Sequence, residues 1–490
     1  MKRVYTMNRI SSLWNSKSQG TKSAIVFTLA ILISRGISFI TTPIFTRIMP
    51  TDQIGIVGLY TSSFAILSSI TSLALNSGGF MVGMKEFEGR RDQYVSSILT
   101  LTSITGFLAL ILFLLFPSFW TNLLGLPLGL VVLMSFGCIL TPAYEFWLMR
   151  QRYEYAYKKA ALITILTSIG STILAVIAVL LLKDYPTLLG EVRQYVAVGS
   201  SLLVYVFFWI LQLKKGRVYF NNFFWTSSLA LSIPLLGHSF ASQMLSVSDR
   251  LFIGKLVDNS AVGIYSTLYT VGSLALMLWG AINSSFVPYL FQNIEDETKR
   301  GKVSYTALLL LIMFSALTIC VSIIAPEITY MLAPAEYLEY VSIVPPIVAG
   351  VYFIAVGNFY SNLLVYCKKT WAIMLSTMIA CSISVSLNVL LIPVLGFEVA
   401  AYNTLFSYLV FGFLQAIFSY RIFKKKLSGD FIYNNAKMIL VSVSTIVLSM
   451  ICIPLYKYNL IRYAFALILI IIALFLFYEK DNKKNSEKDK

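Results

Sequence analysis

An arginine lies in the middle of a long apolar stretch near the start of the chain. The stretch covers about residues 22–49, and Arg35 lies roughly 20 Å from its start at ~1.5 Å per helical residue. A guanidinium at that depth of a bilayer costs at least ~2.5 kcal/mol. The polar residues of this predicted helix recur at helical spacing and form one stripe, which consists of Arg35, Ser38, Thr42 and Thr46.

Two interpretations account for Arg35. Its planar guanidinium can bind a phosphate or diphosphate through paired hydrogen bonds inside a cavity. Alternatively, a carboxylate or backbone carbonyls of the surrounding helices neutralise it. The shortage of deep acidic residues favours the anion site, since only Glu145 and Asp249 lie inside or near the spans without obvious loop membership, and both are toward helix ends.

Three further bases lie near the outer ends of predicted helices: Arg47, Arg250 and Lys255. They are either interfacial side chains whose charged ends reach the headgroup region or a basic ring that receives the phosphates after transfer. Asp249 is expected to pair with a neighbouring base.

The candidates for proton coupling are His238, Asp249 and Glu145. His238 is the only histidine and shares a helical stripe with Asp249. It is either a hydrogen-bonded packing residue or a proton-sensitive switch. Glu145 is close in sequence to Arg150 and Arg152, which favours an interfacial ion pair over a proton carrier.

Prolines and asparagines supply candidates for bending and for a polar cavity. Pro43 and Pro234 interrupt comparable helices in the two halves of the chain, and a proline removes a backbone donor and kinks a helix. Asn358 and Asn362 either line the cavity and contact sugars or hold helices together.

The composition indicates which elements position these residues. The chain has 490 residues, of which 58% are hydrophobic and 12% charged, whereas soluble domains carry about 25% charged residues. The sequence therefore predicts an all-α protein with many membrane spans. The five cysteines have neither metal nor redox spacing, so neither a metal site nor a cofactor is expected.

Fourteen apolar spans are predicted, and the basic residues are distributed unevenly around them. The spans are 22–48, 54–80, 94–116, 122–148, 156–182, 190–213, 225–248, 259–291, 303–332, 339–366, 371–396, 397–423, 436–456 and 458–478. Of 38 Lys and Arg residues, seven lie at outer ends: Arg47, Lys183, Arg193, Arg250, Lys255, Lys457 and Arg462. Apart from Arg35, the others fall in predicted cytoplasmic segments, which predicts cytoplasmic termini. The net charge of +16 is then a topology signal, and no nucleic acid partner is expected.

The chain contains a weak internal repeat. A shift of 208 residues places Gly55 on Gly263 and Arg47 on Lys255. Six spans separate the paired elements, so the repeats are parallel and related by an axis along the membrane normal. The predicted organisation is an N-terminal tail (1–21), two six-helix lobes (22–213 and 225–423), two extra helices (436–478) and a C-terminal tail (479–490).

Two stretches resemble the bacterial polysaccharide flippases of the multidrug/oligosaccharidyl-lipid/polysaccharide exporter superfamily. They are 249–266, at the start of the second half, and 386–409, which contains Asn388, Pro393 and Gly396 in the family pattern. The resemblance implies transfer of undecaprenyl-pyrophosphate-linked oligosaccharide to the outer leaflet of the bacterial cytoplasmic membrane by alternating access. The polymer, O-antigen, capsule or exopolysaccharide, stays open. The expected partners are the lipid-linked substrate, membrane lipids and polysaccharide-assembly proteins such as a polymerase, with the chain itself a monomer.

Two other functions compete with this interpretation. A cation-coupled multidrug exporter of the same superfamily should carry buried carboxylates in its first lobe, and the spans 22–48 and 54–80 contain none. An enzyme would need an external loop that holds a catalytic site, but no predicted external connection exceeds roughly fifteen residues. The sequence therefore favours a transporter.

Overall fold

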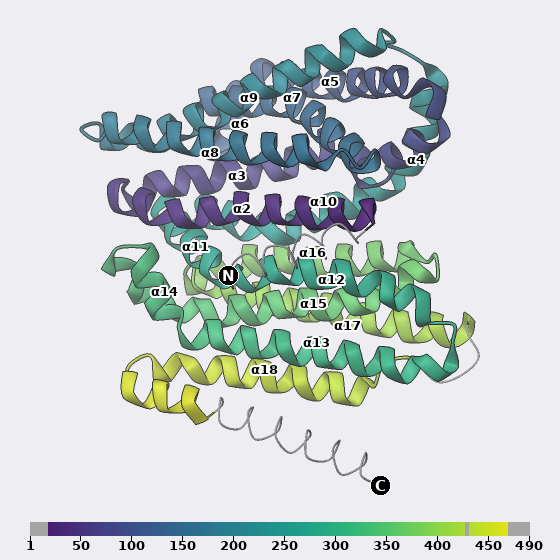
Figure 1. Cartoon of the computed structure of the whole chain (residues 1–490). Helices are drawn as coiled ribbons and strands as arrows, with labels where there is room; N and C mark the ends of the chain where they lie inside the picture. Colours follow the sequence, from purple (N-terminus) through teal and green to yellow (C-terminus); the bar gives the residue numbers. More distant parts are fainter. Residues whose placement is uncertain (1–17, 427–430, 469–490) are drawn as a thin grey trace, which may run out of the picture. The chain divides into compact units, whose positions relative to one another are not determined.

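The computed structural model describes residues 18–426 and 431–468. Most of the predicted N-terminal tail, the predicted C-terminal tail and the second half of the last predicted span lie outside these residues. Every regular element of the described residues is a helix (Figure 1).

The helices follow one another with short connections. The first ten are α2 (Gln19–Ile48), α3 (Thr51–Thr71), α4 (Gly79–Glu86), α5 (Arg91–Leu115), α6 (Pro117–Leu124), α7 (Leu128–Tyr153), α8 (Tyr157–Leu181), α9 (Leu189–Gly216), α10 (Asn222–Leu256) and α11 (Asn259–Gly272). The others are α12 (Leu274–Asn293), α13 (Glu297–Ile323), α14 (Ala325–Leu332), α15 (Val344–Tyr366), α16 (Thr370–Leu395), α17 (Val399–Lys426) and α18 (Asn435–Leu455). Four short 3₁₀ segments complete the order: η1 (Leu75–Ser77), η2 (Glu88–Arg90), η3 (Pro186–Leu188) and η4 (Ala335–Ile343).

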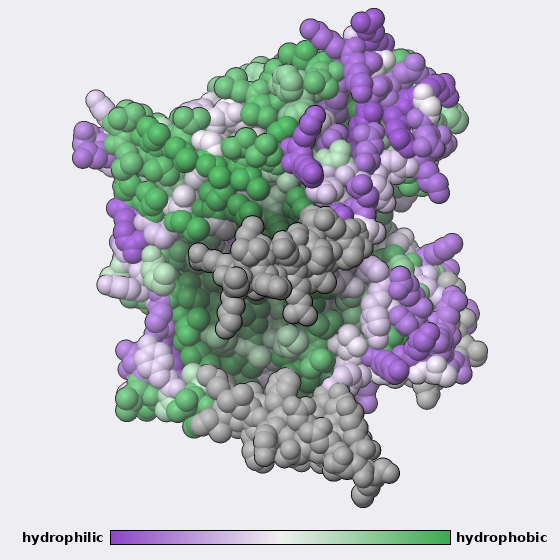
Figure 2. Space-filling view, in the orientation of Figure 1, coloured by the Kyte–Doolittle hydropathy of each residue, from purple (hydrophilic) through white to green (hydrophobic). Residues whose placement is uncertain are grey.

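Twelve helices of the described part are long and apolar enough to cross a membrane. The predicted span 225–248 lies within α10, which is not among the twelve, and the last predicted span begins as a short apolar helix at 459–468. Figure 2 shows apolar helix shafts with hydrophilic residues gathered at the helix ends in each part of the chain. The predicted class, an all-α protein with many membrane spans, is confirmed.

Local chemistry divides several predicted spans differently. The span 259–291 consists of two helices that separate at Ser273. The span 303–332 breaks where Pro326 begins α14, since proline favours the first turn of a helix. Helix α3 begins before the predicted boundary, so Asp52 lies in its first turn, where a carboxylate interacts favourably with the helix dipole.

The described residues group into two compact units. Unit 1 comprises the described part of 1–266 together with 374–400, and unit 2 comprises 267–373 and the described part of 401–490. This grouping places α10 in unit 1 with the preceding helices. The two predicted six-helix lobes remain a prediction.

In unit 1, α10 is tied to the earlier helices by aromatic side chains. The Tyr94 hydroxyl donates to the carbonyl of Gly79 at 3.2 Å and lies 2.9 Å from the Ser228 hydroxyl. The Trp225 indole donates to the carbonyl of Ser97 at 3.0 Å. These contacts satisfy polar groups in the first turns of α10 through protein, as the bilayer favours.

The start of α3 crosses the start of α11 at very close range within unit 1. A Cβ on Gly55 would lie 1.8 Å from the carbonyl oxygen of Asn259, and one on Gly263 would lie 2.1 Å from that of Thr51. The 208-residue shift relates Gly55 to Gly263 and also Thr51 to Asn259, so it exchanges the two contacts. This crossing has the self-complementary form of a two-fold interface, and only glycine fits at its centre.

Unit 2 has its own helix layer, in which α13, α15 and α18 lie side by side (Figure 1). Hydroxyl contacts join them: Ser315 lies 2.6 Å from Thr445, and Tyr352 lies 3.3 Å from Ser442. Beyond α18, the Arg462 guanidinium pairs with a carboxylate of α14, Glu327.

The glycine crossing generates the first prediction. Gly55→Ala and Gly263→Ala force the backbones apart, so each should destabilise the protein by about 1–3 kcal/mol, as overpacking does. Gly199→Ala is the matched control, because its added Cβ meets no atom within 4 Å. Thermal unfolding in detergent, followed by size-exclusion chromatography, measures the difference. Equal stability of Gly55→Ala and Gly199→Ala would contradict the close crossing.

Candidate functional site

Helix α2, which carries the predicted anion site, packs along one face against α8. Phe27, Ala30 and Phe45 on this face are only 6%, 2% and 3% exposed. Phe27 forms a small buried cluster with Tyr157 and Ala160. Apolar contacts on this face therefore fix which sides of α2 remain open.

The open surface of α2 is divided into an apolar side and a polar side. Leu29, Ile33 and Ile40 form the apolar side, with exposures of 51%, 45% and 70%. Arg35 and Ser38 are also exposed, but at ~100° per residue they lie on the other flank of the packed face. When the apolar side faces lipid, the polar side must face water, protein or a ligand.

The hydroxyls of the polar side are satisfied within the helix. The Thr42 hydroxyl donates to the carbonyl of Ser38 at 2.9 Å, and that of Thr46 donates to the carbonyl of Thr42 at 3.0 Å. Such bonds back to the preceding turn are usual for threonine in helices. The Thr42 oxygen can still accept from a ligand, whereas Thr46 is only 4% exposed and is therefore not part of the open polar surface.

Arg35 has no such partner. The described residues provide neither a hydrogen bond nor an ion pair to its guanidinium, which is exposed on the polar side. A charge at this depth requires water or an anion to offset its desolvation. The described residues therefore give Arg35 no neutralising partner, and its place in an aqueous cavity stays a prediction.

The other predicted phosphate-binding residues each contact protein. Arg250 is nearly buried and donates to the carbonyl of Ser246 at 2.9 Å, and the same Nη1 lies 3.4 Å from a carboxylate oxygen of Asp249. This confirms the expected pairing of Asp249. The Lys255 ammonium donates to the carbonyl of Asn122 at 3.0 Å, near the end of α6. A cation at a helix C-terminus is favourable, so these contacts give both bases structural partners.

Arg47 likewise contacts its own helix. Its Nη1 donates to the carbonyl of Pro43 at 3.1 Å, and the side chain is exposed at the end of α2. This geometry fits an interfacial side chain, and it leaves the guanidinium accessible from outside the helix.

The three predicted coupling residues have different environments. His238 has a buried Nδ1 with no hydrogen-bond partner among the described residues. Asp249 forms the ion pair with Arg250 that is described above. Glu145 accepts a hydrogen bond from the Asn76 amide at 3.1 Å. The prediction of an ion pair between Glu145 and the nearby arginines is therefore wrong, because those arginines contact other residues.

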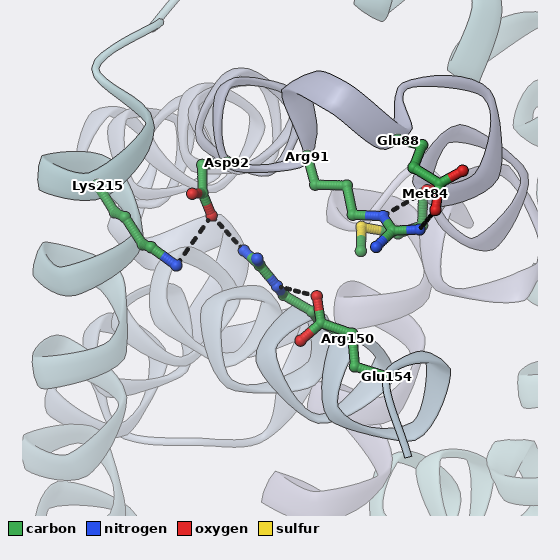
Figure 3. A network of polar contacts seen from close by, with 7 residues as sticks. All are labelled: Met84, Glu88, Arg91, Asp92, Arg150, Glu154 and Lys215. Carbon is green, nitrogen blue, oxygen red and sulfur yellow. Dashed lines mark hydrogen bonds and ion pairs between the residues drawn. The ribbon is translucent and has the colours of Figure 1, made fainter. Parts of the chain in front are cut away.

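The basic end of α7 joins three helices through one ionic network (Figure 3). Arg150 pairs with Asp92 at the start of α5, and its Nε lies 2.9 Å from Glu154. The Lys215 ammonium of α9 lies 3.2 Å from the same Asp92 carboxylate. Two cations therefore share Asp92, and Arg150 is unavailable to Glu145.

In unit 2 the two predicted cavity asparagines differ from each other. The Asn362 amide donates to the Asn283 side chain on α12 at 2.9 Å, so it joins two helices. The side chain of Asn358 is half-buried and has no partner among the described residues. Asn358 is thus the better candidate for a polar cavity wall.

Arg193 has a contact that sequence reasoning did not predict. Its guanidinium lies 3.7 Å from the centre of the Phe45 ring, which joins α9 to α2. This cation–π contact places a second cation beside the helix that carries Arg35. The sequence signal was weak, since Arg193 appeared only as one of the seven bases at outer ends.

Comparisons with known proteins extend over most of the chain. The family model described as polysaccharide biosynthesis protein matches residues 21–294, more than half of the chain. A protein of Haemophilus influenzae, described as an uncharacterized membrane protein, is 22% identical over 318 residues and spans 62% of this chain and 74% of its own length.

Two solved structures share the fold. The inward closed conformation of the lipid II flippase MurJ has a TM-score of 0.67 at 15% identity, covering 93% of this chain and 99% of that one. An inward-facing multidrug resistance MATE transporter of the MOP superfamily has a TM-score of 0.61 at 12% identity, covering 83% and 100%. The fold is therefore one that flippases and drug transporters share.

The ionic network yields the second prediction. Arg150→Ala removes charged hydrogen bonds to Asp92 and Glu154, and it should lower stability by about 1–3 kcal/mol. Lys214→Ala, an exposed neighbour of Lys215 with no ion pair among the described residues, should have little effect. Thermal unfolding in detergent compares them, and an Arg150→Ala protein as stable as the control would refute a structural role.

Proposed function

Because the chain belongs to the polysaccharide biosynthesis protein family, we propose that it transfers a lipid-linked oligosaccharide across the cytoplasmic membrane. Membership of this family confirms the resemblance found in the sequence. The proposed substrate is an undecaprenyl-pyrophosphate-linked repeat unit for O-antigen, capsule or another surface polysaccharide. Transfer runs from the inner to the outer leaflet, with both termini cytoplasmic and with a polymerase or other assembly protein accepting the product.

One observation carries the proposal, namely the exposed Arg35 on the polar side of α2. A diphosphate brings negative charge into a low-dielectric region, where an uncompensated charge is costly. The guanidinium offsets part of that cost and holds the phosphate oxygens through paired hydrogen bonds. Between substrates, water in the cavity solvates the same charge. A neutral substrate would need no such residue.

The neighbouring hydroxyls suit the same ligand. Ser38 and Thr42 lie one and two turns from Arg35 on the same side of α2 and can bond phosphate or sugar oxygens. In unit 2, the half-buried Asn358 is a separate candidate for contact with a sugar. Arg47, at the outer end of α2, is placed to attract the diphosphate when the cavity opens outward.

Prolines supply the proposed bending. Pro43 lies inside α2 and Pro234 lies inside α10, and each leaves the carbonyl four residues earlier without its helical donor. Bending at these points changes the direction of the polar side of α2 without unfolding the helix. Alternating access can then proceed with the ends of the helices held in place.

A cation-coupled multidrug exporter is the second candidate, because the MATE transporter shares the fold. Within α2 and α3 the one carboxylate is Asp52. It lies in the first turn of α3 and accepts a hydrogen bond from Gln53 at 2.8 Å. A carboxylate at a helix start is poorly placed to bind a coupling ion deep in the lobe, so the flippase is favoured.

The third prediction tests Arg35. Arg35→Ala should reduce glycan export at least tenfold in a flippase-null strain, since a charged hydrogen bond contributes about 1.5–3 kcal/mol. Arg35→Lys should retain part of the export, and Arg35→Glu should retain least. Ile33→Ala, at the same depth on the apolar side, should export normally.

Membrane protein levels are measured on the same cells. Normal export by Arg35→Ala would exclude the anion site. Loss of the folded protein in Arg35→Ala, but not in Arg35→Lys, would assign Arg35 a structural role instead.

The fourth prediction concerns coupling. We propose that His238 titrates during the cycle, since histidine changes charge between about pH 5 and 8 and its buried Nδ1 lacks a partner among the described residues. His238→Ala should flatten the pH dependence of transport in proteoliposomes. Ser242→Ala, one turn away on α10, should leave the profile unchanged. A His238→Ala profile identical to that of the wild type would return His238 to a packing role.

A further inference from the structure

We propose that unit 2 contains a binding site for an anionic phospholipid, in a groove between α15, α17 and α18. This proposal uses residues of unit 2 alone and does not depend on the proposed substrate. The groove has a volume of about 500 Å³. Its apolar walls comprise Phe353, Val356, Leu409, Phe413, Ile417, Ile439 and Val443.

The groove opens on the side of the helices that would face lipid in a membrane. Phe413, Ile439 and Val443 on its rim are 62%, 61% and 51% exposed. They lie within helices that are apolar enough to span a membrane. A membrane-exposed apolar groove is filled by hydrocarbon, because neither water nor a polar ligand suits it.

Small residues of α17 create the space. Gly412 and Ala416 lie one turn apart on the side of α17 that lines the groove. A Cβ on Gly412 would already contact the Phe353 ring at 3.4 Å. The groove thus exists because the residues of α17 that line it are small, and a larger residue on its wall would fill it.

One end of the groove is polar and positively charged. Arg421 and Tyr420 line it, and Lys424 lies 5.9 Å from the centre of the Tyr420 ring. The other polar groups there satisfy each other, since the Tyr360 hydroxyl donates to Asn435 at 3.0 Å. The Arg421 guanidinium has neither a hydrogen bond nor an ion pair to a described residue, so it can bind a phosphate. Basic residues at this interface attract anionic lipids.

The length of the groove indicates which kind of lipid fits it. From Arg421 to Leu409 the chain rises twelve helical residues, which is ~18 Å. One leaflet has about half of the ~30 Å hydrocarbon core. An acyl chain whose phosphate lies at Arg421 therefore fits the groove lengthwise. A polyprenyl chain of many isoprene units would extend far beyond it.

Native mass spectrometry of the purified full chain tests the proposal, with dioleoylphosphatidylglycerol as the anionic probe and dioleoylphosphatidylcholine as the neutral one. We expect the anionic lipid to be retained at least tenfold more strongly. Arg421→Gln should abolish this preference, whereas Lys425→Gln, an exposed base outside the groove, should preserve it.

A second pair of variants tests the apolar wall. Val443→Trp fills the groove. Val447, one turn further along α18, is 50% exposed against 51% for Val443 but does not line the groove, so Val447→Trp is the control. Val443→Trp should lose the retained lipid and Val447→Trp should keep it, with both eluting as folded protein. Equal retention of the two lipids by the wild type, or equal retention by both tryptophan variants, would each overturn the proposal. The wild-type comparison requires no variant to fold.

Discussion

A bilayer leaves an internal polar group only three kinds of partner, namely protein, water or a ligand. Several cations of the described residues have protein partners. Arg250 has Asp249, Lys255 has the carbonyl of Asn122, and Arg462 has Glu327. Arg35 has none within the described residues although it lies deep in an apolar helix. The proposed function depends on this contrast, because a cavity with water or a diphosphate is what remains to satisfy it.

The glycine crossing is a second close constraint within unit 1. At Gly55 and Gly263 two helix starts related by the internal repeat approach at backbone distance. The contact lies near the helix ends, so the parts of the helices beyond it can diverge. In the proposed transport cycle, the crossing stays fixed while α2 and α10 bend at Pro43 and Pro234.

Much of the fold follows from the sequence, because hydropathy and the bilayer thickness determine where spans begin and end. The points at which one apolar run divides into two helices were harder to predict, since the separation at Ser273 lies inside one continuous apolar run. Helix α10 contains a predicted span but is not among the twelve long apolar helices, and some of its polar groups contact protein, such as Ser228 with Tyr94. The stripe around Arg35 was predictable because it depends only on spacing along one helix. The partners of Lys255 and Glu145 were not, since Asn122 and Asn76 are 133 and 69 residues away.

The central claim is that Arg35 recognises the diphosphate of a lipid carrier. Binding of undecaprenyl diphosphate and of uncharged undecaprenol to the purified protein tests it most directly, by native mass spectrometry on the wild type and Arg35→Ala. The wild type should prefer the diphosphate, and the variant should lose about tenfold or more of that preference while binding the alcohol unchanged. An equal preference for the diphosphate in both proteins would contradict the account.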